Sequence, residues 1–328
     1  MTGESVTGLV SVVVASYNHA RYLPRRMESL INQTYPNMEI LVIDDHSPDD
    51  SVEVLRRYAD HPRVQLIERE QNGGWVTVSN QGIELSRGEF VLFANCDDDC
   101  EPEMVERLVR AIQSKPSVGL AFCRSLMVDE NGDAHGDDFQ IRETLFRERC
   151  CQDCFLPRDE MRRFLMHSCV IPNLSAALIR RCCFDQVGVL SHDYRACSDW
   201  DLFFRIADGF DFAYVAQPLN HFRQHARTIR SATRGRVTYD EFFRVLLGQM
   251  KHASFSFADR SRFRLHVMYL WCVELIRPSA AGLMNFPHHL KLAASLDSLS
   301  LFFLLPAFVR RILELPIKAL KRLARKGR

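Results

Sequence analysis

Short apolar runs alternate with amphipathic stretches over the first hundred residues of the chain. Four runs predict strands, at residues 10–15, 38–43, 64–68 and 90–94. The first is rich in β-branched residues and lacks helical spacing, and the apolar run at residues 90–94 is typical of a strand that is buried on both faces. Helical spacing fills the gaps at residues 22–33, 51–58 and 75–86. Strands and helices that alternate at such short intervals form βαβ units, so we expect an α/β fold with a mostly parallel central sheet flanked by helices.

The pattern changes after this first part. A helix is predicted at residues 103–113, a strand at 118–123, a further helix at 199–207 and a short strand at 212–215. From about residue 239 the spacing is helical and no strand signal remains. We therefore expect an α/β domain over residues 1–235 and an α-helical C-terminal region over residues 236–328.

Three consecutive carboxylates, Asp97, Asp98 and Asp99, follow the apolar run at residues 90–94. Adjacent negative charges repel one another, and a hard divalent cation with oxygen ligands would remove that repulsion. Ligands bind at the carboxyl ends of the strands in open α/β sheets, so the sequence indicates a metal site there. The alternative is a solvated acidic turn that caps a helix beginning at Glu103.

Composition sets broad limits on function. With 47% hydrophobic and 25% charged residues, the chain is typical of a globular protein, and its net charge of +1 argues against a nucleic-acid partner. Eleven scattered cysteines and an N-terminus without a signal pattern favour a reducing, cytoplasmic setting. A zinc site at Cys150, Cys151 and Cys154, with His167 and Cys169 nearby, is an alternative, although a second Cys-x-x-Cys pair is missing.

The C-terminal end combines apolar and basic residues. The apolar run at residues 299–309 is interrupted by Pro306 and is shorter than a bilayer-spanning helix, so we expect no span there. The tail that follows contains a single acid, Glu314, and many basic residues. They are Arg310, Arg311, Lys318, Lys321, Arg322, Arg325, Lys326 and Arg328. A basic amphipathic tail indicates peripheral binding to an anionic membrane surface, here the inner face of the cell membrane. A helix packed on the domain with a solvated basic face is the alternative.

Several segments occur in an order that resembles the family 2 glycosyltransferases of the GT-A fold. They are VSVVVASYN, EILVIDDHS, an NGG loop, SNQGIELSRGEFVLFANCDDD and SDWDLFFRIA, and the resemblance extends over about residues 8–230. The resemblance implies an inverting, metal-dependent transfer of a sugar from a nucleotide sugar, expected to be a UDP-sugar. The implied acceptor is a cell-surface glycan or a lipid-linked precursor.

The resemblance also implies roles for residues at the donor site. Ala15 and Tyr17 would lie beside the base, with Tyr17 able to stack on it, and Asp44 would accept a hydrogen bond from the base. Asp97 would face the ribose or the metal, and Asp98 would be the main ligand of Mg²⁺ or Mn²⁺. The family motif begins with an aspartate where this chain has Asn95, which keeps the oxygen but loses the charge. The alternative role of Asp44, instead of binding the base, is to cap the helix that follows it.

The family places its general base in an acidic pair at the start of a helix. Ser198–Asp199 matches that pair, so Asp199 is the candidate base that removes the acceptor proton. Ser198 replaces the usual glutamate, which puts a contact to the acceptor in doubt. Alternatively Asp199 only caps its helix, whose N-terminus would favour the ionised carboxylate. Asp201 is the second candidate.

Phe222–His225 resembles the Tyr-Arg-x-His segment found late in many members. His225 could complete the metal shell or contact the diphosphate, and Arg223 could pair with phosphate oxygens. Two other functions remain open from the sequence. A nucleotidyltransferase would need a Gly-rich basic loop after the first strand, and residues 15–24 contain no glycine. A catalytically degenerate scaffold for glycan assembly would agree with the departures at Asn95 and Ser198.

Overall fold

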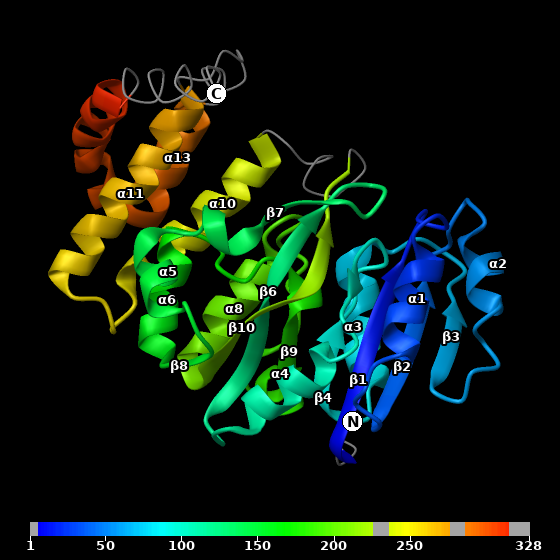
Figure 1. Cartoon of the computed structure of the whole chain (residues 1–328). Coiled ribbons are helices and arrows are strands. Elements are labelled where there is room, and N and C mark those ends of the chain that lie inside the picture. The colour runs from blue at the N-terminus through cyan, green and yellow to red at the C-terminus, as the bar shows by residue number, and fades with distance from the viewer. Residues whose placement is uncertain (1–5, 226–235, 276–285, 315–328) are drawn as a thin grey trace, which may run out of the picture. The chain divides into compact units, whose positions relative to one another are not determined.

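The computed structural model describes residues 6–225, 236–275 and 286–314. Its contacts divide the chain into two compact units, Met1–Thr228 and Ile229–Arg328. A ten-stranded sheet lies in the first unit, with helices on both of its faces, and the described part of the second unit is helical (Figure 1). The predicted α/β fold with a helical C-terminal region is therefore confirmed.

The strands of the sheet run in the order β3-β2-β1-β4-β9-β6-β10-β5, while β7 pairs with β6 and β8 with β10. Their bounds are β1 Val6–Ser16, β2 Met38–Asp44, β3 Val64–Glu68, β4 Gly88–Phe93, β5 Asp99–Cys100, β6 Val118–Val128, β7 Ala134–Asp137, β8 Cys154–Leu156, β9 Ala177–Arg180 and β10 Asp211–Arg223. The pairs among β1 to β4 are parallel, as is β6 with β10, whereas β9 is antiparallel to both β4 and β6.

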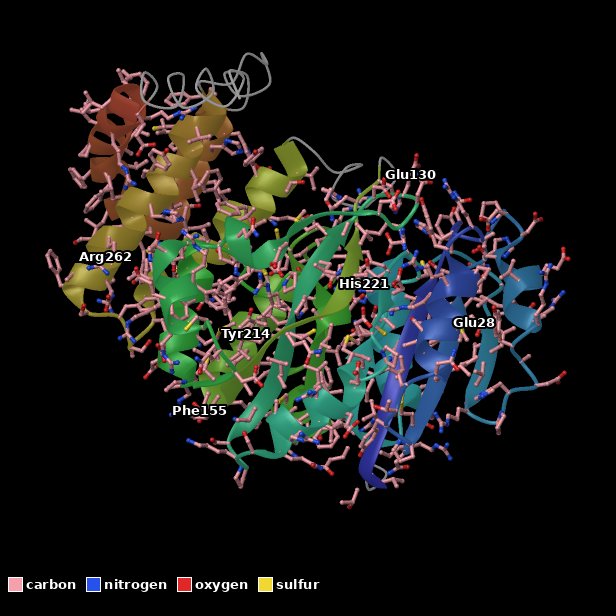
Figure 2. All side chains as sticks on the ribbon, in the orientation of Figure 1. Glu28, Glu130, Phe155, Tyr214, His221 and Arg262 are labelled. Carbon is pink, nitrogen blue, oxygen red and sulfur yellow. The ribbon has the colours of Figure 1, made fainter. Side chains whose placement is uncertain are left out.

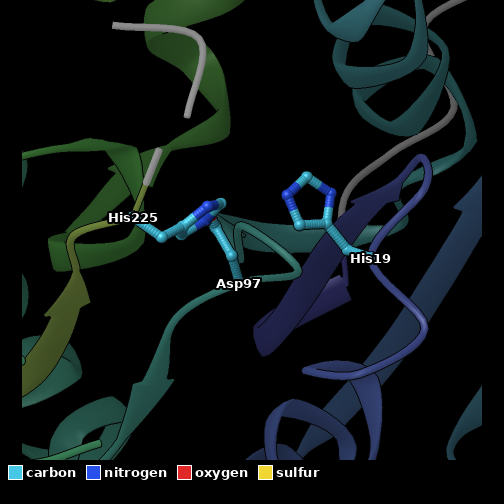
Figure 3. A group of neighbouring side chains, drawn as sticks. All are labelled: His19, Asp97 and His225. Carbon is cyan, nitrogen blue, oxygen red and sulfur yellow. The ribbon is translucent and has the colours of Figure 1, made fainter. Parts of the chain in front are cut away.

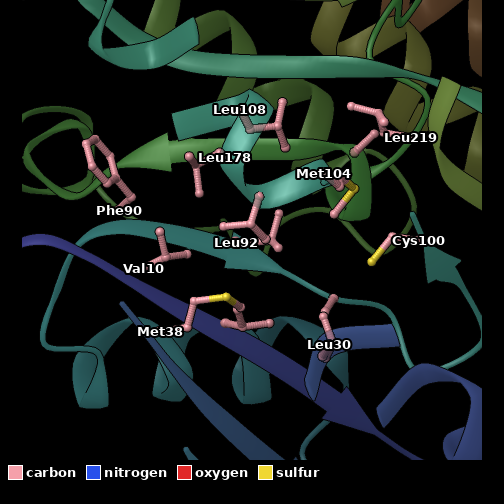
Figure 4. Close-up of a cluster of buried hydrophobic side chains, with 14 of the residues drawn as sticks. Val10, Leu30, Met38, Phe90, Leu92, Cys100, Met104, Leu108, Leu178 and Leu219 are labelled. Carbon is pink, nitrogen blue, oxygen red and sulfur yellow. The ribbon is translucent and has the colours of Figure 1, made fainter. Parts of the chain in front are cut away.

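Helices cover both faces of the sheet in the first unit. They are α1 Leu23–Ile31, α2 Ser51–Arg56, α3 Trp75–Leu85, α4 Met104–Gln113, α5 Thr144–Arg149, α6 Arg158–His167, α7 Arg181–Val187 and α8 Ser198–Gly209, with short 3-10 turns η1 Asp138–Ile141 and η2 Leu174–Ala176. Alternate residues of β1 face opposite layers. Val10 belongs to the cluster that contains Leu30 of α1 and Leu108 of α4 (Figure 4), and Val13 faces α3 on the other side.

The main difference from the sequence prediction concerns β10, which carries the chain from the core to the site. A strand was expected only at residues 212–215, but β10 extends over 13 residues to Arg223. Tyr214 and His221 both lie on it (Figure 2). Register irregularities interrupt its pairing with β6 around Pro218, which hides the alternation that would mark one continuous strand. β5 and β8 have too few residues to give a periodic signal.

The second unit contains α10 Arg236–Gly248, η3 Gln249–Lys251, α11 Phe257–Leu275, α13 Phe286–Asp297 and η4 Ser298–Phe303, followed by helical residues 304–314. Polar pairs join its helices. Arg264 of α11 donates to both oxygens of Asp297, at 2.7 and 3.0 Å. The carboxylate oxygens Oδ2 and Oδ1 of Asp240 in α10 lie 2.9 and 2.8 Å from the Nε2 atoms of His288 and His289.

Gly82 sets how closely α3 packs on β1. A Cβ at this position would lie 2.2 Å from Val13 Cγ1, which is far inside van der Waals contact. We expect Gly82→Ala to lower the free energy of unfolding by about 1–3 kcal/mol, because the added methyl group forces α3 away from β1. Urea unfolding measures this. Gly136→Ala in β7 is the control, because its nearest neighbour would be 4.0 Å away; equal stabilities of the two variants would contradict the packing described here.

His221 supports the pairing of β10 with β5. Its Nδ1 donates to Asp99 Oδ1, and its Nε2 lies 3.0 Å from Glu101 Oε1. The hydrogen bond to Asp99 raises the pKa of His221, and burial only partly opposes this. Because the raised pKa belongs to the folded state, the stabilisation is fully present below the unfolded value of about 6.5 and is lost as pH rises through the folded value.

We therefore expect His221→Gln to lower the free energy of unfolding by about 1.5–3 kcal/mol near pH 6. The difference from the wild type should shrink as pH rises, since the imidazolium is lost and only a neutral hydrogen bond remains. Urea unfolding from about pH 5.5 to pH 9 tests this. His192→Gln changes an exposed histidine and serves as the control. A destabilisation that is constant across this range would show that no charged His221 contributes.

Candidate active site

Loops that follow β1 and β2 form one side of the site, at the carboxyl ends of these parallel strands. Ser16 pairs with Asp44 where the strands end. Two residues in these loops, Asn18 and His46, have positive φ angles of 56° and 61°, which are uncommon for residues other than glycine. The Asn18 N–H donates to Ser47 Oγ at 3.0 Å, so the two loops are tied together. Such strained backbone is typical of functional sites.

Asp44 organises this pair of loops from a fully buried position. Its carboxylate accepts hydrogen bonds from Ser16 Oγ at 2.9 Å and from the N–H and Oγ of Ser47 at 2.8 and 2.7 Å. A carboxylate has about four acceptor positions. These contacts therefore leave about one position for a ligand, and the role of Asp44 in base recognition stays a prediction.

Asp45 was not among the predicted site residues, and it holds the NGG loop. Its carboxylate accepts from the N–H groups of Gly73 and Gly74 at 2.9 and 2.7 Å, and from the guanidinium of Arg69. Gly74 has a φ of +83°, which suits glycine and lets both N–H groups point at one carboxylate. In the sequence, the Asp-Asp pair at the end of the second strand and the Asn-Gly-Gly segment further along the chain are the signals from which this contact could have been predicted.

The residues predicted beside the nucleotide base lie at the same edge. Ala15 is the second-last residue of β1 and is half-buried, and Tyr17 follows the strand with 44% of its surface exposed. An exposed aromatic ring next to a strand end could stack on a planar base. The stacking role of Tyr17 and the position of Ala15 beside the base stay predictions.

The three consecutive aspartates point in different directions. Asp99 is buried and accepts from Arg25 Nε at 2.8 Å and Arg223 Nη2 at 2.7 Å as well as from His221. Although burial alone would raise the pKa of Asp99, His221 and the two arginines lower it. The charge of Asp99 is thus balanced by protein cations. The expectation that a metal must relieve the repulsion among all three carboxylates was wrong for this residue.

Asp98 faces the protein interior. The Arg223 N–H donates to its Oδ1 at 2.9 Å, and Asn173 Nδ2 and Asn95 Nδ2 donate to its Oδ2 at 2.6 and 3.4 Å. Burial, followed by the nearby charge of Asp97, raises the pKa of Asp98 to about 7. Because its oxygens already accept these hydrogen bonds, the structure favours another residue as the main metal ligand. The same contact explains why Asn95 can replace the aspartate of the family motif. Its amide donates a hydrogen bond to Asp98, whereas a carboxylate at this position would repel Asp98.

Arg223 fixes the acidic turn from a nearly fully buried position. Its Nε donates to the Asp97 carbonyl oxygen at 2.7 Å, its Nη1 to the Asp129 carbonyl oxygen at 2.8 Å, and its Nη2 to Asp99. The guanidinium also lies 5.2 Å from the centre of the Tyr22 ring. Each side-chain nitrogen of Arg223 thus already donates to a protein oxygen, and its suggested phosphate contact stays a prediction.

Asp97, His225 and His19 come together from three distant parts of the chain (Figure 3). Each offers one ligand atom, and these atoms lie within 4.8 Å of one another. His225 Nε2 is 3.0 Å from Asp97 Oδ2. Against the effect of burial, that hydrogen bond and the two nearby histidines lower the pKa of Asp97, which favours the ionised carboxylate. The structure thus brings two of the predicted residues, Asp97 and His225, into one cluster.

His19 was not identified from the sequence, although it follows the SYN segment directly. Its Nδ1 lies 2.6 Å from the Tyr17 carbonyl oxygen, which can only accept, so Nδ1 carries the hydrogen of the neutral ring. The other nitrogen, Nε2, is buried and has no hydrogen-bond partner among the described residues. A buried imidazole nitrogen without a partner is suited to bind a metal, and the tautomer that this requires is already fixed. The donor set of this cluster therefore fits a divalent cation.

Asp199 lies in the first turn of α8, where its Oδ1 accepts from the Trp200 N–H at 2.8 Å. The neighbouring Ser198 is buried, and its Oγ donates to the Ser191 carbonyl oxygen at 2.9 Å, which anchors the preceding loop. Asp201, the second candidate base, accepts from Arg205 Nε at 2.8 Å. The role of Asp199 as base, with Asp201 as the second candidate, stays a prediction.

The alternative zinc site is not formed by the residues that were expected to build it. Cys150 and Cys154 approach each other, with their Sγ atoms 3.6 Å apart. Cys169 Sγ instead lies 3.3 Å from the Ile171 carbonyl oxygen, and His167 Nδ1 is 3.5 Å from a Glu143 oxygen. Over residues 6–225, 236–275 and 286–314, the one group able to hold a metal is the cluster of His19, Asp97 and His225.

Solved structures with a similar fold include several that contain nucleotides. S. aureus TarS 1-349 in complex with UDP-GlcNAc superposes with a TM-score of 0.64 at 17% identity, covering 88% of this chain and 80% of that one. The mannosyltransferase PcManGT from Pyrobaculum calidifontis, in complex with GDP-Man and Mn²⁺, gives a TM-score of 0.51 at 15% identity over 92% of this chain and 86% of that one. At these identities the likeness shows the shared fold, which confirms the expected GT-A architecture.

Relatives in sequence match the first unit. A protein of Bacillus subtilis (strain 168) named EpsH is 29% identical over 226 residues, 68% of this chain and 63% of that protein. The chondroitin synthase of Escherichia coli is 33% identical over 148 residues, 44% of this chain and 21% of the synthase. The chain thus spans less than two thirds of either relative. The family described as "Glycosyl transferase family 2" matches residues 11–187, more than half of the chain. The chain belongs to glycosyl transferase family 2.

Proposed function

We propose that the chain transfers a sugar from a nucleoside-diphosphate sugar to an acceptor hydroxyl group, with a divalent cation bound by Asp97, His225 and His19. One observation carries this proposal: an ionised carboxylate and two imidazoles converge at the carboxyl edge of the sheet, and one imidazole nitrogen is buried without a partner among the described residues. A cation there would stabilise the negative charge that develops on the departing diphosphate.

Manganese suits this donor set better than magnesium. Mg²⁺ prefers oxygen ligands in an octahedral shell, whereas Mn²⁺ also accepts imidazole nitrogen. Two of the three candidate ligands are histidines. The solved complex of PcManGT with GDP-Man and Mn²⁺ supports this choice.

The proposed donor is a UDP-sugar. Support comes from the exposed ring of Tyr17 beside the half-buried Ala15, from the remaining acceptor position of Asp44, and from the similar fold of TarS in complex with UDP-GlcNAc. Uracil would stack on Tyr17 and donate its N–H to Asp44.

The proposed transfer is a single displacement with inversion. Asp199 takes the proton from the acceptor hydroxyl, whose oxygen forms a bond to the anomeric carbon. The bond from that carbon to the diphosphate oxygen breaks, and the nucleoside diphosphate leaves with the electron pair. A cell-surface glycan or a lipid-linked precursor is the proposed acceptor, and relatives named as chondroitin synthases support a polysaccharide product.

Removal of one ligand tests the metal site. We expect Asp97→Asn and His19→Gln each to weaken Mn²⁺ binding at least about tenfold, because each removes one of three ligands. Calorimetric titration of Mn²⁺ in the presence of UDP measures this. Asp60→Asn, which changes an exposed aspartate after α2, is the control. An unchanged affinity in His19→Gln would remove His19 from the shell, and absence of UDP binding to the folded wild type would favour the scaffold alternative.

Asp199 and Asp201 form a matched pair for testing the base. We expect Asp199→Asn to slow transfer by about 10²–10⁴-fold while UDP-sugar binding stays unchanged, because an amide cannot accept the acceptor proton. Asp201→Asn removes the ion pair with Arg205, whose guanidinium keeps its hydrogen bonds to the Val187 and Val189 carbonyl oxygens, and should transfer at nearly the wild-type rate. Single-turnover transfer to a glycan acceptor measures both. The opposite ranking of the two variants would move the base to Asp201.

A further inference from the structure

An apolar surface is exposed on the second unit, along the segment that follows α13. Its side chains recur at intervals of three or four residues, as on one face of a helix. They are Leu299, Phe302, Leu305, Phe308, Val309, Ile312 and Leu313, all exposed to solvent. Phe302 and Leu305 stand out with 79% and 71% of their surface exposed. Contiguous exposed apolar surface of this kind marks an interaction site.

The opposite side of this segment is anchored within its own unit. Ser300 and Ala307 are fully buried. Glu314 accepts a hydrogen bond from the Tyr269 hydroxyl of α11, and the Arg310 guanidinium lies 4.8 Å from the centre of the Tyr269 ring. The segment is therefore held against α11 by one face, and its apolar face is exposed among the described residues of this unit.

The helical run Phe286–Glu314 has 29 residues and a mean hydropathy of 1.8 over its most apolar window. By length and composition alone this longer helix could cross a membrane, whereas the expectation of no span concerned only the apolar run at residues 299–309. Its contacts argue against a span. Asp297 near its middle forms the buried pair with Arg264, and His289 pairs with Asp240. Crossing the bilayer would place these polar pairs in hydrocarbon, where they are costly.

Charge indicates which partner fits. Arg310, which pairs with Glu314 at 3.1 Å, and Arg311 follow Val309 directly in the sequence, and six further basic residues follow between positions 318 and 328. Apolar side chains bordered by cations match the interface of an anionic bilayer, where the apolar groups enter the acyl boundary and the cations meet headgroup phosphates. We propose that the apolar face of residues 299–313 inserts into the surface of an anionic bilayer without crossing it.

Vesicle binding by the full chain tests this proposal. We expect sedimentation with vesicles of phosphatidylcholine and phosphatidylglycerol, and weaker binding to phosphatidylcholine alone. Replacing both Phe302 and Leu305 by serine should weaken binding to anionic vesicles at least about tenfold, because two large apolar groups no longer enter the bilayer. The matched control replaces Ile141 and Leu145 of the first unit by serine, since these are 71% and 55% exposed. Circular dichroism verifies that all variants are folded.

Each other result would overturn the proposal. If the Phe302/Leu305 variant bound anionic vesicles as tightly as the wild type, the apolar face would not insert, and attachment would depend on the basic residues alone. A wild-type dimer without lipid that becomes a monomer in this variant would assign the face to a second copy of the chain. Resistance of the bound protein to alkaline carbonate would indicate a spanning helix. The assay contains no nucleotide sugar, so its outcome is independent of the proposed transfer reaction.

Discussion

Three adjacent carboxylates at the end of a buried strand must each be compensated, and Arg223 is the residue on which that compensation depends. Its backbone N–H binds Asp98, its guanidinium binds Asp99 and the Asp97 carbonyl oxygen, and its Nη1 reaches the Asp129 carbonyl oxygen. A buried guanidinium is tolerated only with such partners. This arrangement leaves the Asp97 side chain directed at the two histidines, so the geometry of the candidate metal site follows from the ion pairs behind it.

The first four strands and their helices could be predicted from the sequence because their signals are local. Each strand is a short apolar run, and each intervening helix shows its own spacing, so no knowledge of distant contacts was needed. The return of the chain through β9 and β10 depends on pairing between segments far apart in sequence. β9 lies between β4 and β6 in antiparallel orientation, an order that periodicity cannot reveal.

The candidate site was predictable in its location but not in its internal assignments. Sequence order shows that Asp97, Asp98 and Asp99 follow a strand, yet the direction of each side chain depends on distant donors such as Asn173 and His221. These contacts are the reason that we propose Asp97, instead of Asp98, as a metal ligand. His19 escaped notice because a single histidine after a strand has no distinctive spacing, and only its fixed tautomer and buried Nε2 mark it as a candidate ligand.

The three candidate ligands are separated along the chain by almost the whole first unit. His19 is made early during synthesis, Asp97 midway, and His225 only after β10 is complete. A ribosome-bound chain that has not yet exposed His225 therefore lacks one candidate ligand. If a cation binds at these three residues as we propose, its binding has to wait until the final strand joins the sheet, so metal loading would be a late event in the biogenesis of this unit.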